Sequence, residues 1–133
     1  MKRRDFGISA ITAAAALAAL PRSAKAAVPA GWSNVLFTED NPGHWKGKEK
    51  THTPVVTVAG GKISVNTPHP MTEEHFIVSH AVVLENGDYV DRKTFTWKDQ
   101  PTSDHALPAG YKGNVIVIST CNQHDTWVKI VAV

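Results

Sequence analysis

The sequence predicts a small all-β sandwich, and three observations lead to that prediction. Short β-branched or alternating runs recur along the chain after Pro54, clusters of turn residues separate them, and beyond residue 26 no apolar run repeats with a helical period. A chain of 133 residues is expected to form one domain. Strands with few helices between them pack as two stacked sheets, so this pattern favours a β-sandwich.

Residues 1–26 have the composition of an export signal. A basic start at residues 2–4 is followed by an alanine-rich apolar run at 8–20 and by the small-residue sequence Ala-Lys-Ala at 24–26, which suits signal peptidase. The paired arginines favour the twin-arginine route into the periplasm, with an ordinary secretory signal as the alternative. Because the apolar run is shorter than the ~20 residues that span a bilayer, no membrane anchor is expected after cleavage. The folded domain is expected over residues 27–133.

The basic balance of the full chain is a property of that signal. Residues 1–26 hold five of the 14 basic side chains and one of the 12 acidic ones, which leaves nine against eleven and a formal charge of −2. No basic patch with interleaved aromatic residues remains, so nucleic acid is not an expected partner.

The expected strands follow one another with recognisable turns between them. After an irregular stretch at residues 27–50, a β-branched run and an alternating run flank Gly60-Gly61, which indicates a reversal of the chain. Asn86-Gly87, a pair typical of tight hairpins, separates two longer runs. Residues 98–113 are polar and rich in turn residues, and they are expected to form a loop. The expected strands cover residues 55–58, 62–66, 75–84, 89–97, 114–120 and 127–133.

Three histidines lie outside any motif. His80 alternates with Val78 and Val82 along an expected strand, so its ring is expected to point inward and to have a hydrogen-bonded partner. His44 and His105 are expected to be structural or surface residues.

The other histidines and the single cysteine lie in loops or at strand starts, where a rigid sandwich presents functional side chains. The five candidate metal ligands are His52, His69, His75, Cys121 and His124. One cysteine cannot form a disulfide within the chain, whereas four imidazoles and one thiolate are donors that suit a redox-active iron. Pro54 and Pro70 stiffen the backbone beside two of these histidines, which limits the entropy lost when a metal binds.

Three short motifs carry a resemblance to a known family. His-Thr-Pro at 52–54, His-Pro-Met-Thr-Glu-Glu-His at 69–75 and Cys-Asn-Gln-His at 121–124 resemble the iron-binding domain of superoxide reductases, the neelaredoxin and desulfoferrodoxin proteins. The similarity runs from about Lys48 to Trp127. It implies an immunoglobulin-like β-sandwich of about seven strands, in which the five candidates become four equatorial histidines and one axial cysteine around a single iron. Since the chain has only one cysteine, it resembles the single-iron, neelaredoxin-like type.

The resemblance also implies an activity. In this family, iron cycles between Fe2+ and Fe3+ and reduces superoxide to hydrogen peroxide, and an external electron donor protein restores the ferrous state. A Glu-Lys pair precedes the family's first histidine: the glutamate can occupy the open iron position, and the lysine attracts superoxide. Here Glu49-Lys50 is followed by Thr51, which stands where the family has lysine. We therefore expect Glu49 and Lys50 to serve as that pair, and a homo-oligomer is a further expectation.

Two other functions stay open. Thr51 and the polar residues beside His124, Gln123 and Asp125, also fit a domain of the same fold that binds iron without catalysis and serves in electron transfer or sulfur chemistry. A β-sandwich with one cysteine and several histidines can also be a blue-copper electron carrier. Such sites usually add a methionine after the last histidine, and none follows His124. The leading interpretation is an exported superoxide reductase.

Overall fold

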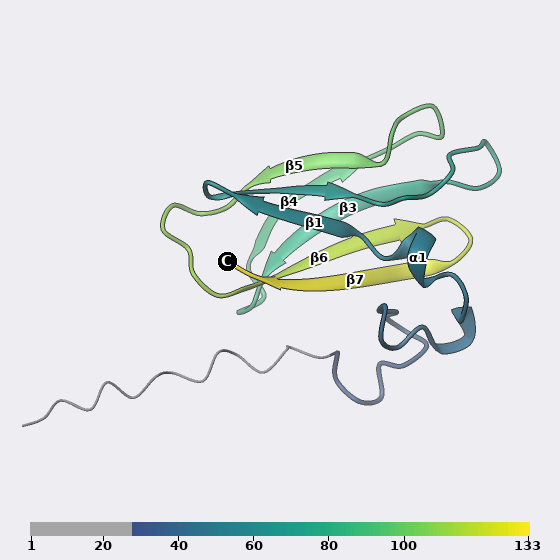
Figure 1. Cartoon of the computed structure of the whole chain (residues 1–133), viewed down its shortest axis with the longest axis horizontal. Helices are drawn as coiled ribbons and strands as arrows, with labels where there is room; N and C mark the ends of the chain where they lie inside the picture. Colours follow the sequence, from purple (N-terminus) through teal and green to yellow (C-terminus); the bar gives the residue numbers. More distant parts are fainter. Residues whose placement is uncertain (1–27) are drawn as a thin grey trace, which may run out of the picture.

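The structure, a computed structural model of the chain, describes residues 28–133 and consists of two packed β-sheets (Figure 1). The three-stranded sheet contains, in spatial order, β1 (Val55–Ala59), β2 (Lys62–Asn66) and β5 (Thr102–Ala106). The four-stranded sheet contains, in spatial order, β4 (Tyr89–Thr94), β3 (Ile77–Leu84), β6 (Asn114–Cys121) and β7 (Asp125–Ala132). All neighbouring strands are antiparallel. The predicted all-β sandwich is confirmed.

Two single helical turns precede the strands: η1 (Gly43–Trp45) and α1 (Glu49–His52). No helix within residues 28–133 has the length and apolar character needed to cross a membrane. The signal expected over residues 1–26 lies outside the described residues, so the export route and the periplasmic location stay predictions.

Turn chemistry explains where the strands reverse. Gly60 and Gly61 join β1 to β2 with positive φ angles of 57° and 73°, a conformation that glycine adopts without steric cost. Gly87, with a φ of 92°, closes the hairpin between β3 and β4 that the Asn-Gly pair predicts.

Strand β5 falls inside residues 98–113, which the sequence predicts to be a loop, so that part of the prediction is wrong. Its inward side chains are Ser103 and His105, which are 5% and 1% exposed. Because both are polar, the strand lacks the apolar alternation that identifies the other strands. Ile63 of β2 lies opposite His105, so the strand still completes the sheet.

The interior contains two apolar clusters with buried polar side chains between them. The larger cluster consists of Ile63, Val65, Val82, Leu84, Leu107, Val115 and Val117. The smaller one consists of Ile77, Phe95 and Cys121, with Met71 against it. Along β6, Val117 belongs to the larger cluster, Ser119 is polar and Cys121 belongs to the smaller cluster. His80 lies opposite Ser119 in the register and is fully buried and hydrogen-bonded, as predicted.

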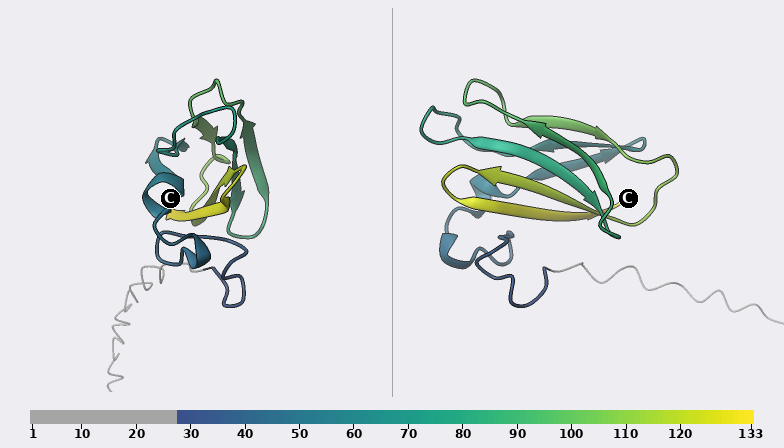
Figure 2. Two further views of the ribbon diagram at one scale, coloured as in Figure 1. Left: turned by 90° about the vertical axis from the view of Figure 1, so that its right-hand side faces the viewer. Right: turned by 180° about the vertical axis from the view of Figure 1, so that it is seen from behind.

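The segment before β1 runs alongside the four-stranded sheet, next to β7 (Figure 1, Figure 2). Phe37 forms an isolated parallel bridge with Trp127, and the two fully buried rings are 5.6 Å apart. This contact places α1 at the same end of the sandwich as the turn between β6 and β7 (Figure 1). Segments that carry candidate ligands thereby meet at one end of the fold.

Candidate metal centre

Four imidazoles and one thiol that are distant in the sequence meet at this end of the sandwich. They belong to His52, His69, His75, Cys121 and His124, and one donor atom of each lies within 4.8 Å of every other. In the part of the chain that the structure describes, no other group of three or more His, Cys, Asp or Glu side chains is arranged in this way. All five predicted ligands are therefore brought together.

Three short contacts link one nitrogen of each of the four imidazoles. Nε2 of His69 lies 3.0 Å from Nε2 of His75, which lies 2.9 Å from Nδ1 of His124. That nitrogen of His124 lies 3.0 Å from Nε2 of His52. Imidazole–metal bonds of about 2.1 Å, set at right angles, place neighbouring nitrogens about 3.0 Å apart. These three spacings fit imidazole ligands around a single ion.

Cys121 and His124 are brought together by a tight turn. Cys121 pairs with Asp125 across the hairpin, and Asp125 has a positive φ of 61°, a conformation common in short hairpins. Sγ of Cys121 lies 3.7 Å from Nδ1 of His124 and 3.9 Å from Nε2 of His69. The backbone N–H of Gln123 donates to the sulfur at 3.5 Å, a contact that favours a thiolate.

His52 is oriented by the turn that it ends. Its Nδ1 atom lies 2.8 Å from Oγ1 of Thr51 and 3.1 Å from the carbonyl oxygen of Lys48, and the Thr51 hydroxyl donates to the same carbonyl. Because a carbonyl can only accept, Nδ1 carries the proton and Nε2 keeps its lone pair for the cluster. Thr51 thus supports the first histidine.

His75 is tied to the turn between β6 and β7 through Asn122. The Asn122 side chain accepts the Phe76 N–H at 3.0 Å and donates to the Glu74 carbonyl at 3.0 Å. The side-chain amide of Gln123 donates to the same carbonyl at 2.7 Å. These bonds on both sides of His75 give the polar residues of the Cys-Asn-Gln-His motif a supporting role.

His69 is 7% exposed and leaves one nitrogen without a partner. Its Nδ1 atom faces the backbone of Pro70, yet it forms no hydrogen bond of good geometry within residues 28–133. Its Nε2 atom meets only the imidazole of His75 and the sulfur of Cys121. Because Nε2 is the nitrogen that lies against the other donors, it is the atom that a cation in the cluster would bind, whereas Nδ1 has no partner within the described residues.

Burial sets the protonation states of the cluster. It lowers the pKa of His52 and of His69 to about 4, with a further contribution from the charge of neighbouring imidazoles. It also lowers the pKa of His75 and of His124. The same cause raises the pKa of the Cys121 thiol. At neutral pH the imidazoles therefore present free lone pairs, while the thiol keeps its proton until a cation replaces it.

The positive charge of Lys48, the residue before α1, acts on three of the four imidazoles. It adds to the burial that lowers the pKa of their rings, because one positive charge disfavours another nearby. The affected residues are His69, His75 and His124. Lys48 is therefore a cation whose charge acts on the cluster.

Glu49 and Lys50, the predicted Glu-Lys pair, both lie on α1. The Glu49 carboxylate accepts the Gly47 N–H at 2.9 and 3.0 Å, and this bond is the largest cause of the lowered pKa of Glu49. The charges of Lys46 and Lys50 act in the same direction on that carboxylate. The structure brings neither Glu49 nor Lys50 into the cluster, and their catalytic roles stay predictions.

Sequence reasoning missed three residues that support or face the site. Asn122 lies inside a recognised motif, which is a signal that could have identified it. Lys48 carries no such signal. Trp45 packs edge-on against His124 with ring centroids 4.6 Å apart, and its indole N–H donates to Asp125 at 2.9 Å.

The comparisons with known proteins agree with this geometry. The sequence matches the family model described as Desulfoferrodoxin over residues 44–129, which is nearly two thirds of the chain. No curated protein sequence matches the chain.

Several solved structures share the fold. A variant of the superoxide reductase (neelaredoxin) from Ignicoccus hospitalis is 24% identical with a TM-score of 0.66, and the match covers 80% of this chain and 98% of that one. A superoxide reductase in the oxidised state is 26% identical with a TM-score of 0.58, and the match covers 77% of this chain and 98% of that one. A variant of the superoxide reductase (neelaredoxin) from Archaeoglobus fulgidus, in the reduced form, is 25% identical with a TM-score of 0.57. The match covers 65% of this chain and 90% of that one.

Proposed function

The chain belongs to the desulfoferrodoxin family, and from this premise we propose that it is an exported superoxide reductase with one iron ion per chain. The observation that carries the proposal is the cluster of four imidazole nitrogens, linked by three contacts of 2.9–3.0 Å, with a thiol beside it. Four imidazoles and one thiolate suit iron and leave a sixth position for a small ligand.

The proposed ligands are His52, His69, His75 and His124 through the ring nitrogens named above, and Cys121 through sulfur. An iron ion held by these residues would supply the electron for the reaction, and the thiolate of Cys121 would increase its tendency to give that electron up. The chain keeps the imidazoles neutral and in place, and it releases the thiol proton when the ion binds. One superoxide, one electron and two protons yield one hydrogen peroxide, so an external donor protein has to return the electron.

Substrate attraction is assigned to Lys48. Superoxide is an anion, so a positive charge beside the cluster raises its encounter rate. The charge of Lys48 acts on three imidazoles, whereas that of Lys50 acts on Glu49. His75 and His124 are only partly buried, which gives water and protons access to this side of the site.

The N-terminal sequence supports the export part of the proposal. Residues 1–26 combine paired arginines, an apolar run and a small-residue cleavage sequence. Expression of the full chain in a bacterium with and without its twin-arginine translocase tests this part, because a periplasmic product that persists without the translocase points to the ordinary secretory route.

Metal analysis, spectroscopy and rapid mixing test the proposed activity. Anaerobically purified protein should contain one iron per chain and show a thiolate-to-iron charge-transfer band on oxidation, and Cys121→Ser should lose that band. Stopped-flow mixing with superoxide should oxidise the iron and produce one hydrogen peroxide per superoxide. Iron without this reaction would support the non-catalytic iron-binding domain, and copper with an intense blue band would support an electron carrier.

A further inference from the structure

Six side chains outside the metal centre form one continuous hydrogen-bonded chain through the core, named here the polar chain. Its members, in order from the surface, are Asp91, His105, Ser103, His80, Thr67 and Ser119. Consecutive polar atoms are 2.7–2.8 Å apart along its whole length. The side chain of Asp91 is 53% exposed, and every other member is at most 5% exposed.

The polar chain joins the two sheets. Asp91 lies on β4, and His105 and Ser103 lie on β5. His80 lies on β3, Thr67 directly follows β2, and Ser119 lies on β6. Hydrogen bonds therefore pass between the three-stranded and the four-stranded side of the sandwich at four places. Such a fully bonded polar layer fixes the two sheets relative to each other, because hydrogen bonds depend on direction as well as distance.

The carboxylate of Asp91 determines where the protons of the polar chain lie. An ionised carboxylate only accepts, so Nδ1 of His105 donates to it, and with this one proton on the ring Nε2 accepts from the Ser103 hydroxyl. Ser103 has then used its only proton, so it accepts from Nδ1 of His80. The order Asp91, His105, Ser103 is that of a hydrolase triad, but Ser103 is 5% exposed and bonded on both sides, so no substrate reaches it.

The inner end of the polar chain follows the same rule of donors and acceptors. Nε2 of His80 accepts from the Thr67 hydroxyl, which in turn accepts from the Ser119 hydroxyl. This order of donors places the proton on Nδ1 of both imidazoles of the polar chain. Burial lowers the pKa of His80 to about 4, which agrees with a neutral ring.

The inner end lies in register with two proposed metal ligands. Thr67 precedes His69 by two residues, and Ser119 precedes Cys121 by two residues. The Thr67–Ser119 hydrogen bond of 2.8 Å therefore joins the same two segments as the contact of 3.9 Å between Nε2 of His69 and Sγ of Cys121. The His69 N–H also donates to the Thr67 carbonyl at 2.7 Å, so this ligand and the Thr67 hydroxyl belong to one short turn.

We propose that Thr67 and Ser119 are positioning residues that hold His69 and Cys121 at the separation required for metal binding, and that Asp91 orients the polar chain from the surface. The proposal rests on the proposed function only in taking His69 and Cys121 as ligands. Loss of an outer partner of a metal ligand typically lowers metal affinity ten- to a hundredfold.

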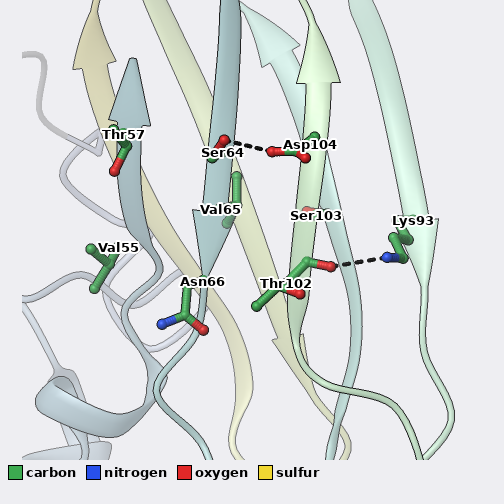
Figure 3. A pocket seen from close by; sticks show the side chains of 9 residues that line it. All are labelled: Val55, Thr57, Ser64, Val65, Asn66, Lys93, Thr102, Ser103 and Asp104. Atoms are coloured by element: carbon green, nitrogen blue, oxygen red, sulfur yellow. Dashed lines mark hydrogen bonds between the residues drawn. The ribbon is translucent and has the colours of Figure 1, made fainter. Parts of the chain in front are cut away.

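Nuclear magnetic resonance on the full chain, with diamagnetic zinc in the site, tests the proton positions. Correlations between ring protons and ring nitrogens identify the tautomer, and we expect Nδ1–H at both His80 and His105. Asp91→Ala removes the fixed acceptor, so both rings should shift towards Nε2–H together. Asp104→Ala is the matched control, because the Asp104 side chain bonds to Ser64 and to no member of the polar chain. The hollow of about 400 Å³ that Asp104 lines also includes Ser103 and Lys93 (Figure 3).

Two results would overturn the orientation by Asp91. One is an Nε2–H or doubly protonated ring at His80 or His105 in the unaltered protein. The other is a tautomer change confined to His105 in Asp91→Ala, since Ser103 has one proton and couples the two rings. Asp91 is largely exposed, so this variant is expected to fold.

Cobalt binding tests the positioning role, because the thiolate-to-cobalt absorption band reports the bond to Cys121. Thr67→Val and Ser119→Ala should each lower the affinity for Co2+ at least tenfold and shift that band. Thr53→Val is the matched control, since the Thr53 hydroxyl is buried without a partner and its loss breaks no hydrogen bond. Unchanged affinity and an unshifted band in both chain variants would overturn the proposal. Absence of superoxide reduction by the iron-loaded protein would bear on the proposed function alone.

Discussion

Loading the site with Fe2+ at pH 7 should release about one proton per ion, and that proton should come from Cys121. Burial lowers the pKa of His52 and of His69 to about 4, so these rings have almost no proton to lose, and it also lowers the pKa of His75 and of His124, which therefore release fewer protons than ordinary imidazoles. Burial raises the pKa of the Cys121 thiol, so its proton is present until the ion replaces it.

The expected number of protons distinguishes this site from four ordinary histidines. An imidazole with the usual pKa of about 6.5 is roughly one quarter protonated at pH 7, so four of them would add about one proton and bring the total to about two. With a single proton released, the affinity for iron should rise about tenfold from pH 7 to pH 8, which corresponds to about 1.4 kcal/mol.

Anaerobic titration calorimetry in buffers of different ionisation enthalpy measures the released protons directly. Cys121→Ser is the control: its hydroxyl does not ionise in this range, so the released protons should fall to almost none and the affinity should no longer rise with pH. A value of about two in the unaltered protein would show that the imidazoles are protonated and that the burial argument is wrong. A value close to zero would mean that the thiol is not a ligand.

Three further predictions concern substrate attraction, the core and the support of His75. Lys48→Ala should slow superoxide consumption and flatten its dependence on ionic strength more than Lys50→Ala does. Stopped-flow measurements at several salt concentrations check this, and equal effects of the two substitutions would contradict the assignment to Lys48. Burial lowers the pKa of His80 from 6.5 to about 4, so this residue should contribute a loss of stability of about 1.4 kcal/mol per unit as the pH drops through that range, in addition to the losses from His52 and His69 in the metal-free protein. Urea unfolding at pH 7 and pH 5 should show this loss in the unaltered protein and a smaller one in His80→Gln. Asn122→Ala removes the side-chain hydrogen bonds to the Phe76 N–H and the Glu74 carbonyl, together with a weak contact from the Cys121 thiol, and should cost about 1–3 kcal/mol in thermal unfolding of the metal-free protein. An unchanged midpoint would deny Asn122 its supporting role.

The strands and the candidate ligands can be predicted from the sequence for different reasons. Strand β6 buries every second residue, and this period of two is a local property that the sequence displays. The candidate ligands lie in short motifs, because a single turn has to bring two donors together, as the hairpin does for Cys121 and His124. That all motifs meet at one point follows from the resemblance, since spacing within a motif says nothing about the distance between motifs.

Features that depend on contacts between distant segments are not visible in the same way. Strand β5 buries polar residues, and Ser103 is acceptable there only because His80, from the other sheet, completes its hydrogen bonds. Lys48 and Lys50 have the same side chain, and only in the folded chain does it emerge that the charge of Lys48 acts on three imidazoles whereas that of Lys50 acts on Glu49. The Glu-Lys-His pattern of the family therefore points to Lys50, whereas the electrostatics of the folded chain point to Lys48.

The polar layer in the core and the geometry of the candidate metal centre have a common physical basis. Apolar burial has no preferred direction, so the small cluster around Ile77 and Phe95 cannot by itself set the positions of donor atoms to within tenths of an ångström. Hydrogen bonds can set such positions. Asn122 holds the segment of His75, and the Thr67–Ser119 hydrogen bond joins the segments of His69 and Cys121. Polar residues therefore occupy the middle of this core because directional bonds are needed next to the site, even though apolar residues there would bury more hydrophobic surface.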